Sequence, residues 1–558
     1  MNLPQIKSPI LIIGLLSLLY GQKTEINIYN IEKNDLFEID SIIIEVKNAF
    51  EGSRINYKIE KFIFDIGNNI HTNTKINIIK NLLLFKPKDI VNKDILIESE
   101  INLRNKNFLA DANITLNKTK NGKCYAQVIV FDQWSTIPGS GVKRVGNQLS
   151  YWAGISEKNF LGTGQTISLS YHKKLRTNGY TFNYKHPGFK KHRLQFITYY
   201  TNNNEGYNIE LLLKKPLISK TQKFGFLINH IETKKSMWSY LDGNYFNYNY
   251  NKSFNIQTTN ILAKFENIYN KSTRIEVTRS YGIKIKSNIS VFMHNYYQKH
   301  KGNTLIYYDN IEENLNVKYR NESLLGFSIS LDNHEYRRIK NLTNLKWYEN
   351  FNDTKNILIA FGRNLNALGS NNDDFMIYTQ MIYSKSFHSK YFLSAKTYTN
   401  YFVDMNNNKR DGESSININL ITKVNKKLNF YFSTENINNI NKLPSEKLFL
   451  GESNGLLGYP NFYFTGHSLF LLTTEMTYMP NIEIFTIIPA FAIFASSGNT
   501  FEKQNHINFN DLNSSIGIGL RLGLSRSSEK IISHFNISWP INPLINGPIF
   551  SIKSKKHI

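Results

Sequence analysis

The chain has 558 residues, a formal net charge of +24, 33 tyrosines, 37 phenylalanines and a single cysteine, Cys124. Its lysines and arginines are scattered rather than clustered, and it has neither a phosphate-binding loop nor a base-reading motif, which argues against a nucleic-acid partner. A single cysteine excludes an internal disulfide, so the fold must be stabilised by packing or by closure of a sheet.

Residues 1–21 are expected to form a secretory signal peptide. Lys7 precedes an apolar run from Ile10 to Leu19, and Gly21 supplies a small residue at the cleavage point. This run is too short to span a bilayer as a helix, and no later apolar stretch reaches about 18 residues. The sequence therefore excludes helical membrane spans and predicts an exported protein.

A polar lead-in at residues 22–54 precedes a compact mixed unit at residues 55–136. Residues 40–50 of the lead-in fit a short helix or a strand equally well. Within the unit, apolar spacing predicts a strand, two helices and two more strands, with a turn at Asn121-Gly122 between the last two. These elements are expected at residues 59–66, 74–84, 92–106, 111–116 and 125–131.

From residue 145 to residue 552 the chain is predicted to form strand after strand. Between Ile516 and Leu524, isoleucine and leucine alternate with glycine and Arg521, so one strand face is apolar and the other small or charged. Such a face would meet a second sheet in a soluble sandwich, but lipid in an outer-membrane barrel. Repeated segments of about ten residues with this alternation are typical of a transmembrane barrel, whose aromatic girdles would account for the tyrosines and phenylalanines. Compositional drift in an AT-rich genome would raise the same residues.

The predicted fold class is therefore mainly β, with a small α+β domain (β-α-α-β-β) followed by an antiparallel transmembrane β-barrel. At about 25 residues for each strand and its turn, the barrel would have about sixteen strands. Residues 553–558 are expected to follow it as a basic tail.

The first predicted hairpin of the barrel carries the pattern Glu157-x-Asn159-x-x-Gly162-x-Gly164. This pattern is similar to a turn of the bacterial surface antigen superfamily, the BamA/TamA-type outer-membrane barrels. Residues 55–136 resemble the POTRA domains that precede those barrels, and residues 516–524 resemble their penultimate strand. Together these resemblances cover nearly the whole mature chain.

A further resemblance concerns a loop that folds into the lumen of these barrels and carries a Val-Arg-Gly-Phe-type tetrad. Here the tetrad is Leu456-Leu457-Gly458-Tyr459, so Leu457 replaces the arginine. Of the acidic partners that the arginine has in the family, one is retained as Glu475 and the other is replaced by Ser496. Because an unpaired buried charge is costly, losing a cation and an anion together is physically consistent. We expect the loop still to fold inward, held by Gly458, Tyr459 and packing instead of an ion pair.

Two places are candidates for strand addition. POTRA-type domains expose sheet edges, and the strand with Asp111, Ile114 and Leu116 is our candidate edge for a client, with an ordinary spacer domain as the alternative. The barrel is expected to close between a first strand at about 148–155 and a last strand at about 544–552. Pro548 cannot donate to a ladder and Gly547 adds a bend, so this seam is either weak enough to open sideways or merely ends at the proline.

The resemblance implies a protein of the bacterial outer membrane with its N-terminal domain in the periplasm. It implies insertion of outer-membrane proteins or translocation of polypeptides. The expected partners are outer-membrane lipid, unfolded outer-membrane or secreted clients, and periplasmic accessory proteins. A secretion or lipid-translocating pore of the same superfamily, or a porin or surface antigen without a client, remains an alternative. A single POTRA-like domain argues against the central assembly factor, unless residues 22–54 hide a degenerate second one.

We find no catalytic constellation and expect no enzyme activity, metal or cofactor. The residues Asp404, Asn406 and Asn408 have the spacing of part of a calcium loop. They lack its glycine and closing glutamate, so a solvated hairpin tip is expected there.

Overall fold

The chain divides into two compact units in the computed structural model, one formed by residues 1–136 and 158–165 and the other by residues 137–157 and 166–558. The predicted signal peptide, the predicted strand at 59–66 and the turn at Asn121-Gly122 lie outside the described residues. The structure describes residues 24–555 except for 33–34, 49–71, 119–122, 146–147, 175, 190–192, 220, 243–260, 283–284, 308–316, 343–344, 346–347, 444–445, 481, 485–486, 503–506, 525–531, 542–544 and 546.

The first unit contains a four-stranded sheet and two helices. The strands lie in the order β1 (Thr24–Asn27), β5 (Leu109–Lys118), β6 (Cys124–Asp132) and β3 (Ser41–Lys47). Neighbours are antiparallel, except that β3 runs parallel to β6. The remaining elements are the 3-10 turn η1 (Ile28–Asn30), the helices α3 (Ile76–Leu82) and α4 (Lys93–Arg104), and a two-stranded sheet of β2 (Leu36–Glu38) and β4 (Ile90–Asn92).

These elements confirm part of the prediction for this unit. Both predicted helices and the two strands after them are present, and residues 40–50, which fitted a helix or a strand, contain β3. The sequence alone did not predict β1 or its place beside β5.

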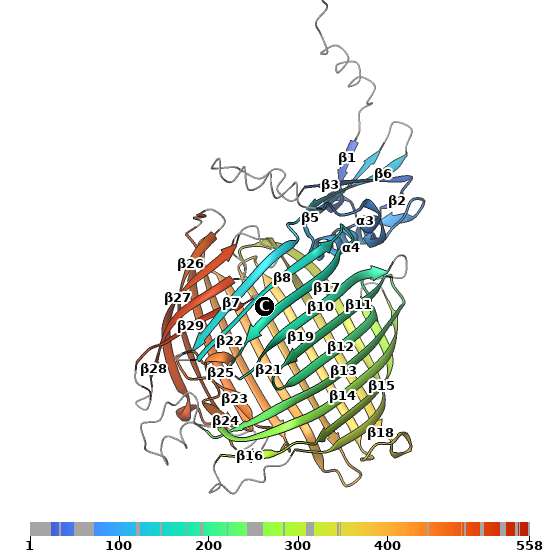
Figure 1. Ribbon diagram of the computed structural model, residues 1–558. Helices are drawn as coiled ribbons and strands as arrows, with labels where there is room; N and C mark the ends of the chain where they lie inside the picture. The colour runs from blue at the N-terminus through green and yellow to red at the C-terminus, as the bar shows by residue number, and fades with distance from the viewer. Residues whose placement is uncertain are drawn as a thin grey trace, which may run out of the picture. The chain divides into compact units, whose positions relative to one another are not determined.

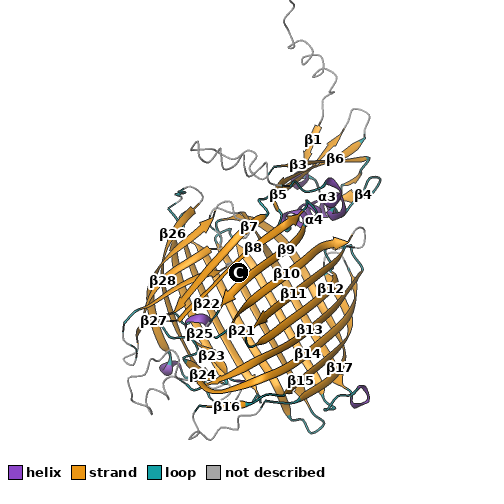
Figure 2. Ribbon diagram, viewed as in Figure 1, coloured by secondary structure: helices purple, strands orange, loops and turns teal. Residues whose placement is uncertain are grey.

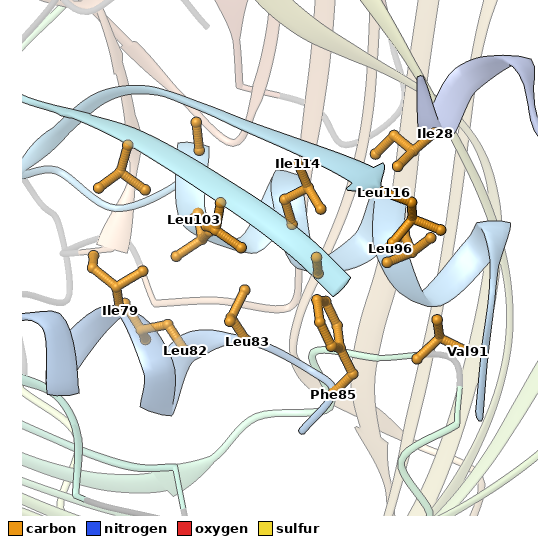
Figure 3. Packing of buried hydrophobic residues seen from close by; sticks show 14 of the residues in the cluster. Ile28, Ile79, Leu82, Leu83, Phe85, Val91, Leu96, Leu103, Ile114 and Leu116 are labelled. Atoms are coloured by element: carbon orange, nitrogen blue, oxygen red, sulfur yellow. The ribbon is translucent and has the colours of Figure 1, made fainter. Parts of the chain in front are cut away.

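The core of the first unit lies between the helices and the sheet (Figure 3). Helix α4 begins after Asn92, whose side chain accepts a hydrogen bond from the Ile95 amide over 3.1 Å. Its helical spacing places Leu96 and Leu103 on one face, and both are fully buried. Burying each such leucine is worth about 1.5–3 kcal/mol. The cluster also contains Ile79 and Leu82 of α3, Ile114 and Leu116 of β5, and Val128 and Val130 of β6.

Cys124 is buried at the start of β6. Burial raises the pKa of its thiol above the ordinary value, an effect that Lys118 opposes and Asp40 adds to. Because the thiolate is the reactive form, we expect a maleimide to label the folded protein at least about ten-fold more slowly than the urea-unfolded protein at pH 8. Equal labelling rates, followed by mass spectrometry, would contradict the packing of β6 against the helices.

The second unit is a closed β-barrel (Figures 1 and 2). In order around the sheet its strands are β7 (Thr136–Val145), β8 (Gln148–Phe160), β9 (Gln165–Lys173), β10 (Asn178–Phe189), β11 (Leu194–Asn203), β12 (Gly206–Lys215), β13 (Phe224–Tyr240), β14 (Ile261–Tyr281), β15 (Lys286–His300), β16 (Thr304–Ile306), β17 (Arg320–Lys340), β18 (Tyr348–Asn364), β19 (Phe375–Phe387), β20 (Tyr391–Val403), β21 (Lys409–Lys423), β22 (Leu428–Ile440), β25 (Ser468–Tyr478), β26 (Ile487–Phe501), β27 (Asn513–Leu524), β28 (Ile532–Ile541) and β29 (Ile549–Lys555).

The expected count of about sixteen strands is too low. In the described part of the chain the closed sheet has about 20 strands, and the very short β16 lies beside β14. The estimate assumed long connections throughout, whereas several hairpins turn within a few residues, such as the one from Asn203 to Gly206. The barrel strands also extend from Thr136 to Lys555, past both ends of the predicted range 145–552.

The outer face of the barrel is apolar, and the alternate positions face the lumen. On β27, Ile516 and Ile518 are 54% and 50% exposed, whereas Ser515 and Arg521 are almost completely buried. This alternation confirms the two-faced strand predicted from residues 516–524. The same exposed apolar face continues around the sheet through Leu169, Phe182, Leu211, Ile228, Val277, Val291, Phe327, Ile359, Met381, Ile416, Met476, Ile493 and Phe550. Among the described residues, no helix is both long and apolar enough to cross a membrane.

The closing seam joins β29 to β7, with Ser551 opposite Val145. The expected first strand at 148–155 is therefore the second, β8, because Pro138 and the glycines after it made β7 read as a linker. Trp152 of β8 covers these glycines, since a Cβ at Gly139 would lie 2.7 Å from its ring.

The two residues singled out at the end of the barrel also lie differently from the expectation. Pro548 comes before β29 rather than within it, so the proline leads into the last strand. Gly547 has a φ of 79°, a left-handed conformation that favours glycine at the turn before that strand.

Candidate functional site

A long segment between β22 and β25, residues 441–467, folds inside the barrel, and we call it the lumen loop. It contains a small hairpin of β23 (Leu448–Leu450) and β24 (Phe464–Gly466), with the 3-10 turn η5 (Glu452–Asn454) between them. Its own aromatic and leucine side chains form a buried core, made of Leu450, Leu456, Tyr459, Tyr463 and Phe464 together with Leu469 and Leu471 of β25.

The predicted tetrad lies against the lumen wall. Leu456 is fully buried and Leu457 partly buried. Gly458 has a φ of 87°, and a Cβ on it would lie 3.1 Å from the Cβ of Ser515, so a larger residue would push the loop off β27. The Tyr459 hydroxyl donates to the backbone oxygen of Ser514 over 2.9 Å. Glycine and tyrosine thus dock the loop, as the sequence predicted.

The predicted lumen partners lie on the neighbouring wall strands. Glu475 of β25 forms an ion pair with Arg521 of β27, with 2.7 Å between Oε2 and Nη2. Arg521 also donates to Asn536 of β28 over 2.7 Å. Ser496 instead shares a hydrogen bond with the Ser515 hydroxyl over 2.8 Å. The retained acid is therefore paired with a wall arginine, which the sequence analysis had quoted without assigning it a partner.

The expectation that the loop is held without an ion pair is wrong. Glu452 of the lumen loop is completely buried, and its Oε1 lies 3.0 Å from the Nζ of Lys553, whose side chain is 7% exposed. The other carboxylate oxygen of Glu452 accepts a hydrogen bond from the Gly458 amide over 2.8 Å. Lys553 was expected in the basic tail, but it is an inward-facing residue of β29. Closure of the sheet brings the last strand to the loop, which local sequence cannot reveal.

A charged network at the opposite wall also holds the loop. Arg320 of β17 pairs with Glu446 of the lumen loop over 2.9 Å and with Asp411 of β21 over 3.2 Å. Arg410 pairs with Glu322 over 2.9 Å and with Asp374 over 2.5 Å. Lys318 completes the network through Asp411. The sequence analysis missed all of these residues, whose charges are far apart along the chain.

Aromatic rings fasten the loop to a third region of the wall. Phe462 stacks on Tyr240, at the end of β13, with 4.7 Å between the ring centroids. The Thr465 amide donates to the carboxylate of Asp242, just past that strand, over 3.1 Å. The lumen loop therefore contacts β13, β17, β27 and β29, which lie far apart around the sheet, so it crosses the bore of the barrel.

The hairpin motif at residues 157–164 is explained by contacts within the first unit, to which the turn between β8 and β9 belongs. Asn159 donates to the Thr74 hydroxyl over 2.9 Å and accepts from the Gly164 amide over 2.8 Å. The Lys75 amide donates to the Gly162 oxygen over 2.9 Å.

The two glycines of this motif are required by close packing. Gly162 and Gly164 have φ values of 71° and 68°, and a Cβ on them would lie 2.4 Å from the Asn73 oxygen and 2.7 Å from the Phe108 ring. Glu157 lies on β8 in the second unit.

The predicted client edge is wrong, because β5 lies inside its sheet. The four residues of β1 pair with residues 115–118, which covers Leu116. Ahead of that pairing, the Ile114 amide donates to Glu100 of α4 over 2.8 Å, and Arg104 donates to the Ala112 oxygen over 3.1 Å. Asp111 pairs with Arg104 over 3.2 Å. The terminal strands of the sheet are β1 and β3.

Asp404 closes its own hairpin turn. Its carboxylate accepts hydrogen bonds from the amides of Asn406 and Asn408 over 2.9 and 2.8 Å, and these bonds lower its pKa. Throughout the described residues, no three histidine, cysteine, aspartate or glutamate side chains gather as they would around a metal ion.

No family model matches the sequence, and no curated protein matches it. Similar solved structures include BamA from Haemophilus ducreyi lacking POTRA domains 1–3, at 11% identity over 92% of this chain and 84% of that chain, with a TM-score of 0.37. CdiB from Escherichia coli matches at 9% identity over 96% and 80%, with a TM-score of 0.45. CdiB from Acinetobacter baumannii matches at 11% over 97% and 79%, with a TM-score of 0.41. Matches of this strength identify no family, so the functional argument rests on the barrel and its lumen.

Proposed function

We propose that this chain is an outer-membrane barrel protein that inserts other outer-membrane proteins or translocates polypeptides across that membrane. The observation that carries the proposal is a barrel with an apolar outer face and a lumen crossed by a loop that buried charges hold in place. A porin keeps its lumen open as a water-filled channel. A crossed lumen instead suits a barrel that handles a client strand at its wall.

In this proposal, bacterial outer-membrane lipid covers the apolar face, and the first unit acts as a POTRA-like domain in the periplasm. Its clients are unfolded outer-membrane or secreted polypeptides, with periplasmic accessory proteins as further partners. The protein would work by binding strands rather than by catalysis, without cofactor or nucleotide.

Strand addition is the proposed mechanism. A free sheet edge binds any extended chain through backbone hydrogen bonds, whatever its sequence. Because β5 is covered, β1 and β3 replace it as candidate edges in the first unit. In the barrel the candidate is the closing seam, where β7 contains Pro138, which cannot donate to a ladder.

A secretion or lipid-translocating pore is the second candidate function. The inward charges of Lys318, Arg320 and Arg410, paired with acids, favour it because they would keep a path hydrated for a polar chain. Such a pore would have to move the lumen loop aside when it opens.

Depletion of the protein, followed by mass spectrometry of the outer membrane, tests the choice. Insertion predicts that several barrel proteins fall together and that re-expression of the wild-type chain restores them. It also predicts that the purified protein conducts little current in planar bilayers. An unchanged set of barrel proteins would contradict insertion, and a large steady conductance would then favour the pore.

A further inference from the structure

Leu342 and Leu345 lie between β17 and β18, yet both are buried, at 7% and 5% exposure. They are at the end of the barrel opposite to the lumen loop, because β17 begins beside that loop at Arg320 and ends at Lys340. Turn residues at the end of a barrel are ordinarily solvated, as Val424 is in the turn between β21 and β22, with 53% exposure. The two leucines therefore need a reason for their burial.

Leu345 packs against side chains on a distant part of the wall. Its cluster contains Met479, which follows β25, Ile488 and Ala490 of β26, and Ile532 of β28. Gly523 of β27 lies beneath it, since a Cβ at that glycine would be 3.3 Å from Leu345 Cδ1. In the order of the sheet, β28 is eight strands beyond β18. Residues that far apart around a closed barrel meet only through the lumen, so Leu345 reaches into the bore.

Leu342 is held on the way across. It packs with Phe392 of β20 and Ile421 of β21. The Asn429 amide of β22 donates to the backbone oxygens of Asn341 and Leu342 over 3.0 and 3.1 Å. These bonds satisfy backbone groups that a surface turn would leave to water, and they fix the leucines against the wall.

Apolar side chains that meet across a narrow bore exclude water and block ions without any charge. We propose that Leu342 and Leu345 form a second stop, which closes the lumen at the end opposite to the lumen loop. Ions would have to pass two blocks in series, one polar and ion-paired, the other apolar. The inference does not depend on what the protein inserts or translocates.

Two changes test the series arrangement in planar bilayers. The first is Leu342→Asp with Leu345→Asp, which hydrates the apolar stop. The second deletes residues 449–465 and joins Leu448 to Gly466 through two glycines, a short bridge that fits because these two residues are register partners. We expect each change alone to leave the conductance at the wild-type level, and the combination to raise it at least about ten-fold.

Val424→Asp is the matched control, because it places a charge on an exposed turn at the same end of the barrel. It should leave the conductance unchanged, alone or with the deletion. Folding is checked by the slower heat-dependent migration of closed barrels in detergent gels. If the aspartates prevent folding, Leu342→Ala with Leu345→Ala removes the apolar bulk without adding charge.

The outcomes divide cleanly. A rise that needs both changes supports two stops in series. Full conductance after the loop deletion alone shows that the leucines stop nothing, and full conductance after the leucine changes alone shows that the loop does not. A combined variant that folds and remains closed overturns the proposal as well.

Discussion

Lys553→Met is expected to destabilise the folded barrel by about 3–5 kcal/mol, because it leaves the buried carboxylate of Glu452 without its cation. Lys553 also donates to the backbone oxygen of Glu452, so its removal frees two acceptors at once. Glu452→Gln should be milder, since the amide can still accept from Lys553. The double variant Glu452→Gln with Lys553→Met should recover part of the loss, because no unpaired charge is then buried.

Unfolding by urea in detergent or lipid, followed by intrinsic fluorescence, measures these differences. Lys271→Met is the matched control, because Lys271 pairs with Glu232 over 3.1 Å on the barrel wall but remains 56% exposed. An exposed pair of this kind is worth about 0–1 kcal/mol. If Lys553→Met costs no more than Lys271→Met, the pair does not hold the lumen loop.

Ile493→Arg is expected to cost about 2–4 kcal/mol of folding free energy in lipid vesicles, as charged side chains do on the lipid face of a barrel near the midplane. Ile493 lies near the middle of β26 and is 67% exposed. In water such a change on an exposed position would be nearly neutral, because an exposed arginine stays hydrated. The size of the loss therefore reports which medium covers the apolar face.

Leu36→Arg is the matched control, because Leu36 is 68% exposed on β2 of the first unit. Both variants are folded into vesicles and titrated with urea. Equal and small effects would mean that water, and not hydrocarbon, covers the barrel. A loss confined to Ile493→Arg supports the outer-membrane location.

The contacts of the N-terminal helices show how far local sequence reaches. The spacing of Ile76, Ile79 and Leu83 indicated a helix, and α3 forms there, because helical periodicity is a property of neighbouring residues. The same reasoning failed for β5, whose edge is covered by β1 and by Glu100. Nothing near Ile114 in the sequence records that residues 24–27 return to pair beside it.

Alternation at every second residue was enough to predict the strands and their two faces, because a strand turns successive side chains to opposite sides whatever its partners are. It also predicted that Gly458 and Tyr459 dock the lumen loop, through the resemblance of their motif. Only the closed sheet decided which strand is first, how many strands there are, and that Lys553 meets Glu452. The physical reason is closure: it brings together side chains about a hundred residues apart, and a buried charge takes whichever counter-charge the closed wall presents.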